Sequence, residues 1–164
     1  MSEPEPPLDP DLLNAYFALM DVAALLRHSV EQQLREEGDL SYVQFQVMAT
    51  LYFSEAGSAR MTDLADGIVH SRSGLTYQVG LLEKAGLVTR APSERDERGV
   101  TVTITEAGRE RLELVMPGHR EVVNHLLLQP LPPDSAVALV ELLGPVREHL
   151  RAAPPRSARP RGRR

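Results

Sequence analysis

Asp63, Asp66 and His70 lie close together in the sequence and are of the types that transfer protons in a reaction. Carboxylates and an imidazole are the usual groups of general acid–base catalysis. Asp63 and Asp66 also suit the cap and the first turn of a short helix, where the helix dipole stabilises an acidic side chain. We favour this structural interpretation, because no nucleophile motif, phosphate-binding loop or metal box accompanies them. The sequence therefore predicts no catalytic residues and no enzyme.

Thiol and metal chemistry find no support in the residue types. The sequence contains no cysteine, which excludes disulfides, a zinc ribbon, a thiol nucleophile and thiol-based redox sensing. Its five histidines include no pair spaced four residues apart on one helix face. We expect neither a metal nor a cofactor.

Polar residues gather on one face of a short predicted helix that begins after Ser71 and ends at Gly86. Leu75, Val79 and Leu82 form its apolar stripe, so the residues between them face solvent. The N-terminal end of such a helix offers free N–H groups that favour phosphate. The outward residues suited to DNA contact are Arg72, Ser73, Thr76 and Tyr77, with Gly80 beside them; Gln78 suits either an outward or an inward position.

A β-hairpin follows this helix. The segments 87–90 and 100–104 are short, β-favouring and alternate apolar with polar residues. The segment 91–99 between them is polar and charged and has Pro and Gly near its ends. Residues 62–104 therefore read as helix, turn, helix and hairpin.

The remaining elements are long helices. We expect helices at 9–38, where Asp9 caps and Gly38 stops the helix, at 41–57, 62–68, 105–129 with a kink at Pro117–Gly118, and 132–152 with a bend at Gly144–Pro145. The first helix is apolar on a wide arc, which indicates either a core helix or one shared between core and dimer interface. The fold class is mainly α with a small β-wing. The expected regions are a disordered 1–8, long helices at 9–38 and 105–152, a lobe of short helices and the hairpin at 41–104, and a disordered Arg-rich tail at 153–164.

The aliphatic composition fits this helical architecture, whereas the excess of acidic residues is not typical of a DNA-binding protein. Apolar residues make up 42% of the 164 residues and aromatics only 4%, so the core is aliphatic. Residues 1–150 hold 12 Lys and Arg against 23 Asp and Glu, whereas 151–164 hold six Arg and no acid. DNA binding needs only a local basic face, with which an acidic remainder is compatible. An acidic, Pro-rich start and no apolar run of membrane length predict a cytoplasmic protein without membrane contact.

The stretch from Met61 to Glu110 resembles the MarR family of winged helix-turn-helix regulators. The matching pieces are Leu64-Ala65, Ser71-Arg72-Ser73, the run LEKAGLV at 82–88, Arg90, the wing tip Asp96-Glu97-Arg98, and TEAGR at 105–109. The resemblance implies a homodimer on a pseudo-palindromic operator in double-stranded DNA, with a recognition helix at 71–86 in the major groove. It makes the helices at 9–38 and 105–152 the dimerisation region and residues 41–104 the DNA-binding region. Repression is the expected outcome of such binding.

The resemblance also assigns roles in the wing. Arg98 would enter the minor groove, Asp96 would hold the tip in shape, and Arg90 and Arg95 would contact phosphates or pair with Asp96. The chain departs from the family at Tyr77, where Arg is common, and at Gly80 and Leu81, where polar or charged residues are common. The operator of a relative therefore does not transfer. A winged helix that has lost DNA binding and contacts only proteins is the alternative.

For an effector, the resemblance implies a small aromatic or anionic ligand near the junction of stalk and lobe. Arg27, His28 and Tyr42 are the candidate ligand-binding residues. A regulator without a ligand, controlled by its own abundance, stays an open alternative. The Arg-rich tail either adds sequence-independent attraction to DNA or is inert.

Overall fold

The computed structural model describes residues 9–68, 71–93 and 96–152, and at residues 96–98 only the backbone. The predictions for 1–8 and 153–164 lie outside this part of the chain. The chain divides into one unit that ends at Val123 and a second that begins at Asn124. The predicted grouping of 9–38 with 105–152 in one dimerisation region stays a prediction.

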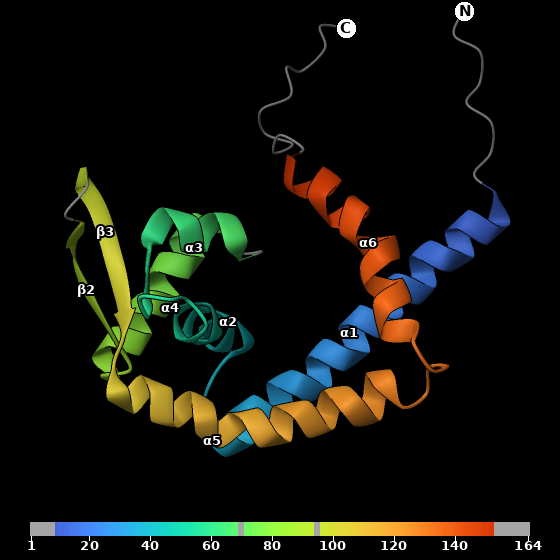
Figure 1. The fold of residues 1–164 in the computed structure, drawn as a ribbon, viewed down its shortest axis with the longest axis horizontal. Coiled ribbons are helices and arrows are strands. Elements are labelled where there is room, and N and C mark those ends of the chain that lie inside the picture. Colours follow the sequence, from blue (N-terminus) through green and yellow to red (C-terminus); the bar gives the residue numbers. More distant parts are fainter. Residues whose placement is uncertain (1–8, 69–70, 94–95, 153–164) are drawn as a thin grey trace, which may run out of the picture. The chain divides into compact units, whose positions relative to one another are not determined.

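The first unit contains a lobe of six helices and strands, which follows one long helix in the chain and precedes another, and these two long helices run side by side (Figure 1). The lobe, as we call residues 42–104, begins where α1 ends and leads into α5. The elements of the first unit follow one another in the order α1 (Pro10–Gly38), α2 (Tyr42–Tyr52), β1 (Ser58–Arg60), α3 (Met61–Gly67), α4 (Arg72–Lys84), β2 (Val88–Ser93), β3 (Asp96–Ile104) and α5 (Glu106–Val123).

Local capping signals place the helix starts of α1, α2 and α4 as predicted. Asp9 accepts a hydrogen bond from the Asp11 N–H at 2.9 Å, and Pro10 follows it as the first helical residue. Ser41 and Gln44 form a reciprocal capping box at the start of α2. Gly86 has φ +73° just beyond α4, which confirms its predicted place at the end of that helix.

Gly38 does not have the role that we predicted for it. It is the last helical residue of α1, and the left-handed cap is Asp39, with φ 51°. A Cβ atom at Gly38 would overlap the Val115 side chain on α5. The glycine is therefore needed for close packing of two helices rather than for ending one.

The sheet differs from the prediction in number and length of strands. Its order is β1–β3–β2, all antiparallel, and β1 was not predicted. The pairing of β2 with β3 continues to Pro92 opposite Val100, so most of the predicted polar tip is strand. Because β1 runs directly into α3, the helix begins at Met61 after Arg60, and the predicted Thr62–Asp63 cap is wrong.

The core of the first unit is aliphatic, as the composition predicts. It joins the C-terminal part of α1 to the lobe and to α5 through Leu34, Met48, Leu75, Val102 and Leu112, each fully buried. Between α1 and α5 the Gln33 amide donates to the Val115 carbonyl at 3.0 Å, and Arg111 donates to the Gly38 carbonyl at 2.7 Å. These bonds satisfy backbone groups at the helix contact.

The second unit consists of a π-helical turn, η1 (Asn124–Leu128), and α6 (Ser135–Ala152). The turn follows α5 directly, so the helical path reaches the region of the predicted end at Gln129. Pro117 lies within α5 and Pro145 within α6, and both helices continue through them. The predicted bends at these prolines stay predictions.

Large apolar side chains remain exposed on the N-terminal two-thirds of α1 and, separately, on α6. On α1 they are Leu12, Tyr16, Phe17, Leu19, Met20, Val22 and Leu25, and on α6 they are Val137, Val140, Leu142, Leu143, Val146 and Leu150. Only the last part of α1, from Val30, is buried by its own chain. Even so, none of the helices in the described ranges is long and apolar enough to cross a membrane.

We expect Gly38→Ala to lower the free energy of unfolding by about 1–3 kcal/mol, because the added methyl group forces α1 and α5 apart. Gly80→Ala is the matched control, since nothing lies within 4 Å of a Cβ there. In a helix interior that control should be neutral or gain up to about 1 kcal/mol. Urea unfolding of both variants at one protein concentration measures the difference. Equal stabilities would contradict the packing role of Gly38.

Candidate nucleic-acid interface

Helix α4 presents one buried face and one exposed polar face. Ser71 caps it by accepting the Gly74 N–H at 3.1 Å. Leu75, Val79 and Leu82 are fully buried, as predicted. These three fix the rotation of the helix about its axis, so the residues on the opposite side of the helix face away from the core.

The structure brings four predicted contact residues together on the exposed face of α4. Arg72, Ser73, Thr76 and Tyr77 are all exposed and occupy its N-terminal half. Thr76 Oγ1 donates to the Arg72 carbonyl at 2.9 Å, and the Tyr77 side chain is 65% exposed. This face combines a guanidinium, two hydroxyls and a phenol, all of which can donate to phosphates or base edges.

Gln78 lies inward rather than on this face. Its side chain is half-buried, and its Oε1 accepts a hydrogen bond from Ser41 Oγ at 3.4 Å. Ser41 is the N-cap of α2. Of the two orientations that the sequence left open, the structure therefore shows the inward one, in which Gln78 connects α4 to the start of α2.

Arg90 is held by a carboxylate of α4. Its Nη2 and Nε lie 2.6 Å and 2.8 Å from Glu83 Oε2, and its backbone N–H donates to Glu83 Oε1 at 3.2 Å. These hydrogen bonds lower the pKa of Glu83. Arg90 thereby fixes β2 to the end of α4. Its predicted contact with a phosphate or with Asp96 stays a prediction, since the Asp96 side chain lies outside the described residues.

The predicted wing residues are only partly described. Arg95 lies outside the described residues, and so do the side chains of Asp96 and Arg98. The backbone of Asp96 and Arg98 belongs to β3, with Asp96 opposite Ser93 of β2. A register shift occurs between Pro92 and Ser93, so the ladder is irregular close to the predicted wing tip.

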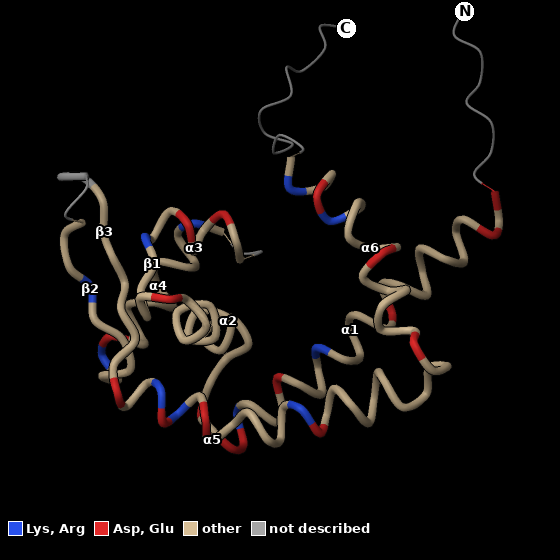
Figure 2. Tube along the Cα trace, in the orientation of Figure 1, with Lys and Arg blue, Asp and Glu red and all other residues tan. Residues whose placement is uncertain are grey.

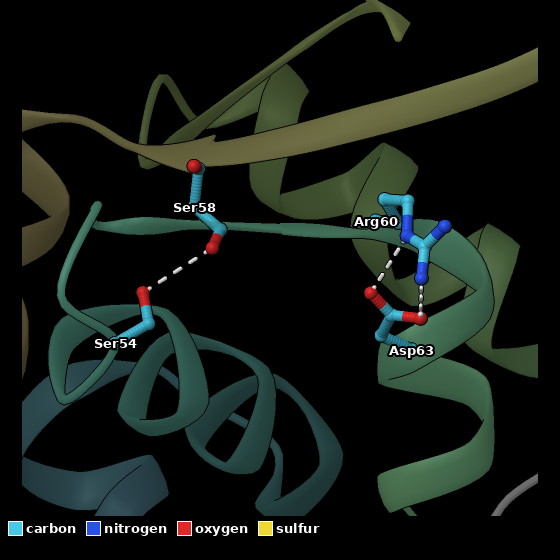
Figure 3. Close-up of polar contacts among 4 residues, drawn as sticks. All are labelled: Ser54, Ser58, Arg60 and Asp63. Atoms are coloured by element: carbon cyan, nitrogen blue, oxygen red, sulfur yellow. Dashed lines mark hydrogen bonds and ion pairs between the residues drawn. The ribbon is translucent and has the colours of Figure 1, made fainter. Parts of the chain in front are cut away.

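Carboxylates accompany the other arginines near α4. Arg60 forms two hydrogen bonds to Asp63, at 2.9 Å and 3.0 Å, across the start of α3 (Figure 3). They lower the pKa of Asp63. Arg72 lies 3.6 Å from Asp66 Oδ1. Over β1 and α3 the trace in Figure 2 accordingly carries acidic positions as well as basic ones. The two aspartates considered for acid–base chemistry are thus ion-pair partners of arginines.

The candidate ligand residues fall into two places, one where α1 meets Tyr42 of α2 and one on α1 alone. The Arg27 guanidinium lies 5.3 Å from the centre of the Tyr42 ring and 2.9 Å from Glu31 Oε1. His28 lines a separate shallow hollow with Gln32, Arg35 and other residues of α1 alone. Arg27 and Tyr42 are therefore brought together, and His28 is not part of their contact.

A hollow between α2 and α5 was not predicted. Its lining includes Tyr52, Phe53, Met116 and Arg120. Tyr52 Oη donates to Glu113 at 2.8 Å, which raises the pKa of Tyr52. The two residues are 61 positions apart, so no local pattern could have indicated the contact. Within the described ranges, no three His, Asp or Glu side chains are grouped so that they could hold a metal ion.

Comparison with known proteins extends over most of the chain. The model of the MarR family matches residues 38–99. The transcriptional repressor YetL of Bacillus subtilis is 24% identical over 143 residues, which cover 87% of this chain and 84% of YetL.

Two solved structures from Streptomyces coelicolor share the fold at higher identity. AbsC, a MarR family transcriptional regulator, is 32% identical, with a TM-score of 0.82, over 89% of this chain and 98% of AbsC. Sco3205, another MarR family regulator and solved in complex with DNA, is 29% identical, with a TM-score of 0.83, over 92% of this chain and 93% of its own. The predicted fold class is confirmed.

Removing the Glu83 carboxylate should produce a stability loss that depends on pH. The bonds from Arg90 hold the folded pKa of Glu83 below its ordinary 4.5. The pair therefore stabilises the fold above that pH, and the stabilisation is lost as the pH falls through the folded pKa. We expect the Tm difference between wild type and Glu83→Gln to be widest near neutral pH and to close in acid.

Calorimetric scans from pH 7 to pH 3 measure this difference. Glu110→Gln, at an exposed position of α5, is the control for loss of one surface charge. A Tm difference for Glu83→Gln that stays constant over the whole range would show that the ion pair with Arg90 is not its cause.

Proposed function

The chain belongs to the MarR family of transcriptional regulators, and from this premise we propose that it acts as a homodimer that binds a pseudo-palindromic operator. The observation that carries the proposal is the exposed face of α4. Its rotation is fixed by three buried side chains, and its N-terminal half displays Arg72, Ser73, Thr76 and Tyr77. A helix of this kind enters the major groove with its N-terminal residues toward base edges.

In this proposal Arg72 donates to a guanine edge or a phosphate, since the guanidinium fork can bind either in two places. Thr76 and Ser73 contact phosphates or bases, and Tyr77 reaches the backbone. The wing adds Arg98 in the minor groove, with Asp96 holding the tip and Arg95 at a phosphate. Arg90 acts through its bond to Glu83, which positions the base of the wing against α4.

The dimer would use the apolar residues that the first unit and the second unit each leave exposed. The α1 stripe from Leu12 to Leu25 and the exposed face of α6 are too extensive for isolated surface residues. A two-fold dimer would set two α4 helices at half-sites about 34 Å apart. Binding over a promoter would exclude polymerase, which makes repression the expected outcome. The proposal places the protein in the cytoplasm and gives it no catalytic reaction.

A small aromatic or anionic effector would bind beside Arg27 of α1 and Tyr42 of α2 and would replace Glu31 as the partner of Arg27. The cation–π contact supports this proposal, because it holds the Arg27 guanidinium beside an aromatic ring. We expect benzoate to raise the Tm of the wild-type protein and to raise that of Arg27→Ala less. An equal rise in both proteins, or none in the wild type, would contradict this site.

Arg72→Ala should weaken binding to a preferred DNA site by about 5- to 150-fold, which corresponds to the loss of one bidentate base contact. Fluorescence anisotropy with a site selected from genomic fragments measures the affinity, over a series of salt concentrations. Arg120→Ala, an exposed arginine of α5, is the matched control and should leave the affinity unchanged.

Arg98→Ala tests the wing separately and should weaken binding to the preferred site, because it removes the cation proposed for the minor groove. Selection of fragments that yields no preferred site would contradict the proposed function. It would favour the alternative of a winged helix that contacts only other proteins.

A further inference from the structure

Arg72 is the one cation in the N-terminal half of α4, whose residues are all described. The sequence of α4 contains a second cation only at Lys84, its last residue. The electrostatic attraction between the exposed face of α4 and DNA therefore depends on the charge of a single guanidinium. Any group that neutralises Arg72 removes the side-chain part of that attraction and leaves only the N–H groups at the start of the helix.

Asp66 is such a group. It lies in the last turn of α3, and its Oδ1 is 3.6 Å from Arg72 Nη2. Both side chains are largely exposed, 73% for Asp66 and 79% for Arg72. An exposed pair at this distance is weak, because water screens it and no hydrogen bond closes it. DNA can therefore displace the carboxylate from Arg72.

The other two pairs near α4 are tighter. Arg60 and Asp63 form two hydrogen bonds, and Arg90 binds Glu83 through both its side chain and its backbone. Those arginines are committed to holding α3 and β2 in place. Arg72 is the member of the three that can exchange its carboxylate for another acceptor at the lowest cost.

Resting on the function proposed above, we propose that Asp66 is a specificity-determining residue that penalises contact of Arg72 with phosphate more than contact with a base edge. A phosphate is an anion, so it must replace the carboxylate and is repelled by it when it approaches. A guanine edge offers two acceptors without net charge, so Arg72 can bind it while the carboxylate remains close. Asp66 thus weakens non-specific binding more than it weakens binding to the preferred site.

The test compares Asp66→Asn with wild type on a preferred site and on random-sequence DNA of the same length. The amide keeps the shape of the side chain and removes its charge. We expect the variant to bind random DNA about two- to fivefold more tightly, as an exposed ion pair allows. Its affinity for the preferred site should change less, and its salt slope on random DNA should steepen by up to about 0.9, one more phosphate neutralised.

Asp63→Asn is the matched control, since it removes an equal charge from the same short helix but from the pair with Arg60. It should leave the ratio of the two affinities unchanged. In an Arg72→Ala background, Asp66→Asn should no longer alter that ratio. This double-mutant cycle isolates the coupling between the two residues from the general effect of one charge less.

An equal gain in affinity of Asp66→Asn for both DNAs would overturn the role of Asp66. So would an unchanged effect of Asp66→Asn on the ratio of the two affinities in the Arg72→Ala background. Either result would leave the proposed function intact. A wild-type protein without any preferred site would instead overturn the proposed function. Circular dichroism and a thermal melt of each variant establish that the helix content and the stability of the fold are retained. The two failures are therefore distinguishable in one set of titrations.

Discussion

Gly38 lets the end of α1 approach Val115 of α5 more closely than any side chain would permit. The Gln33 amide and the Arg111 guanidinium then bond to backbone carbonyls across the same contact. The chain enters the lobe shortly after Gly38, at the end of α1, and leaves it at Glu106, the first residue of α5. The contact of α1 with α5 therefore fixes both the entry and the exit of the lobe, and the sheet and α4 take their positions from there.

Within the lobe, contacts between residues distant in sequence fix the position of α4 relative to α2 and β2. Ser41 caps α2 and also donates to Gln78, so the start of one helix fixes the middle of another. Glu83 binds Arg90 and ties the end of α4 to β2. The polar face of α4 is thus held from both sides, which is the preorganisation that recognition of a rigid partner such as DNA requires.

Helix caps and buried helix faces depend on residues close in sequence and can be predicted from it. Strand pairing and ion pairs between distant residues cannot. The capping box of Ser41 and Gln44, and the stripe of Leu75, Val79 and Leu82, lie within a few turns of chain and were read directly. Strand β1 has three residues and no alternation, and it exists because β3 pairs with it from more than 40 positions away. The partners of Arg72 and Arg90 were missed because helix and strand packing, not spacing, brings the carboxylates to them.

The pairing of arginines with carboxylates also bears on how a regulator searches a chromosome. Non-specific sites outnumber a target by about a million or more, so a protein that adheres to all of them is mostly sequestered. An arginine such as Arg90, which Glu83 holds through both its side chain and its backbone, adds little to that adhesion. Each visit to random sequence is then brief, and fewer molecules per cell suffice to keep a target occupied.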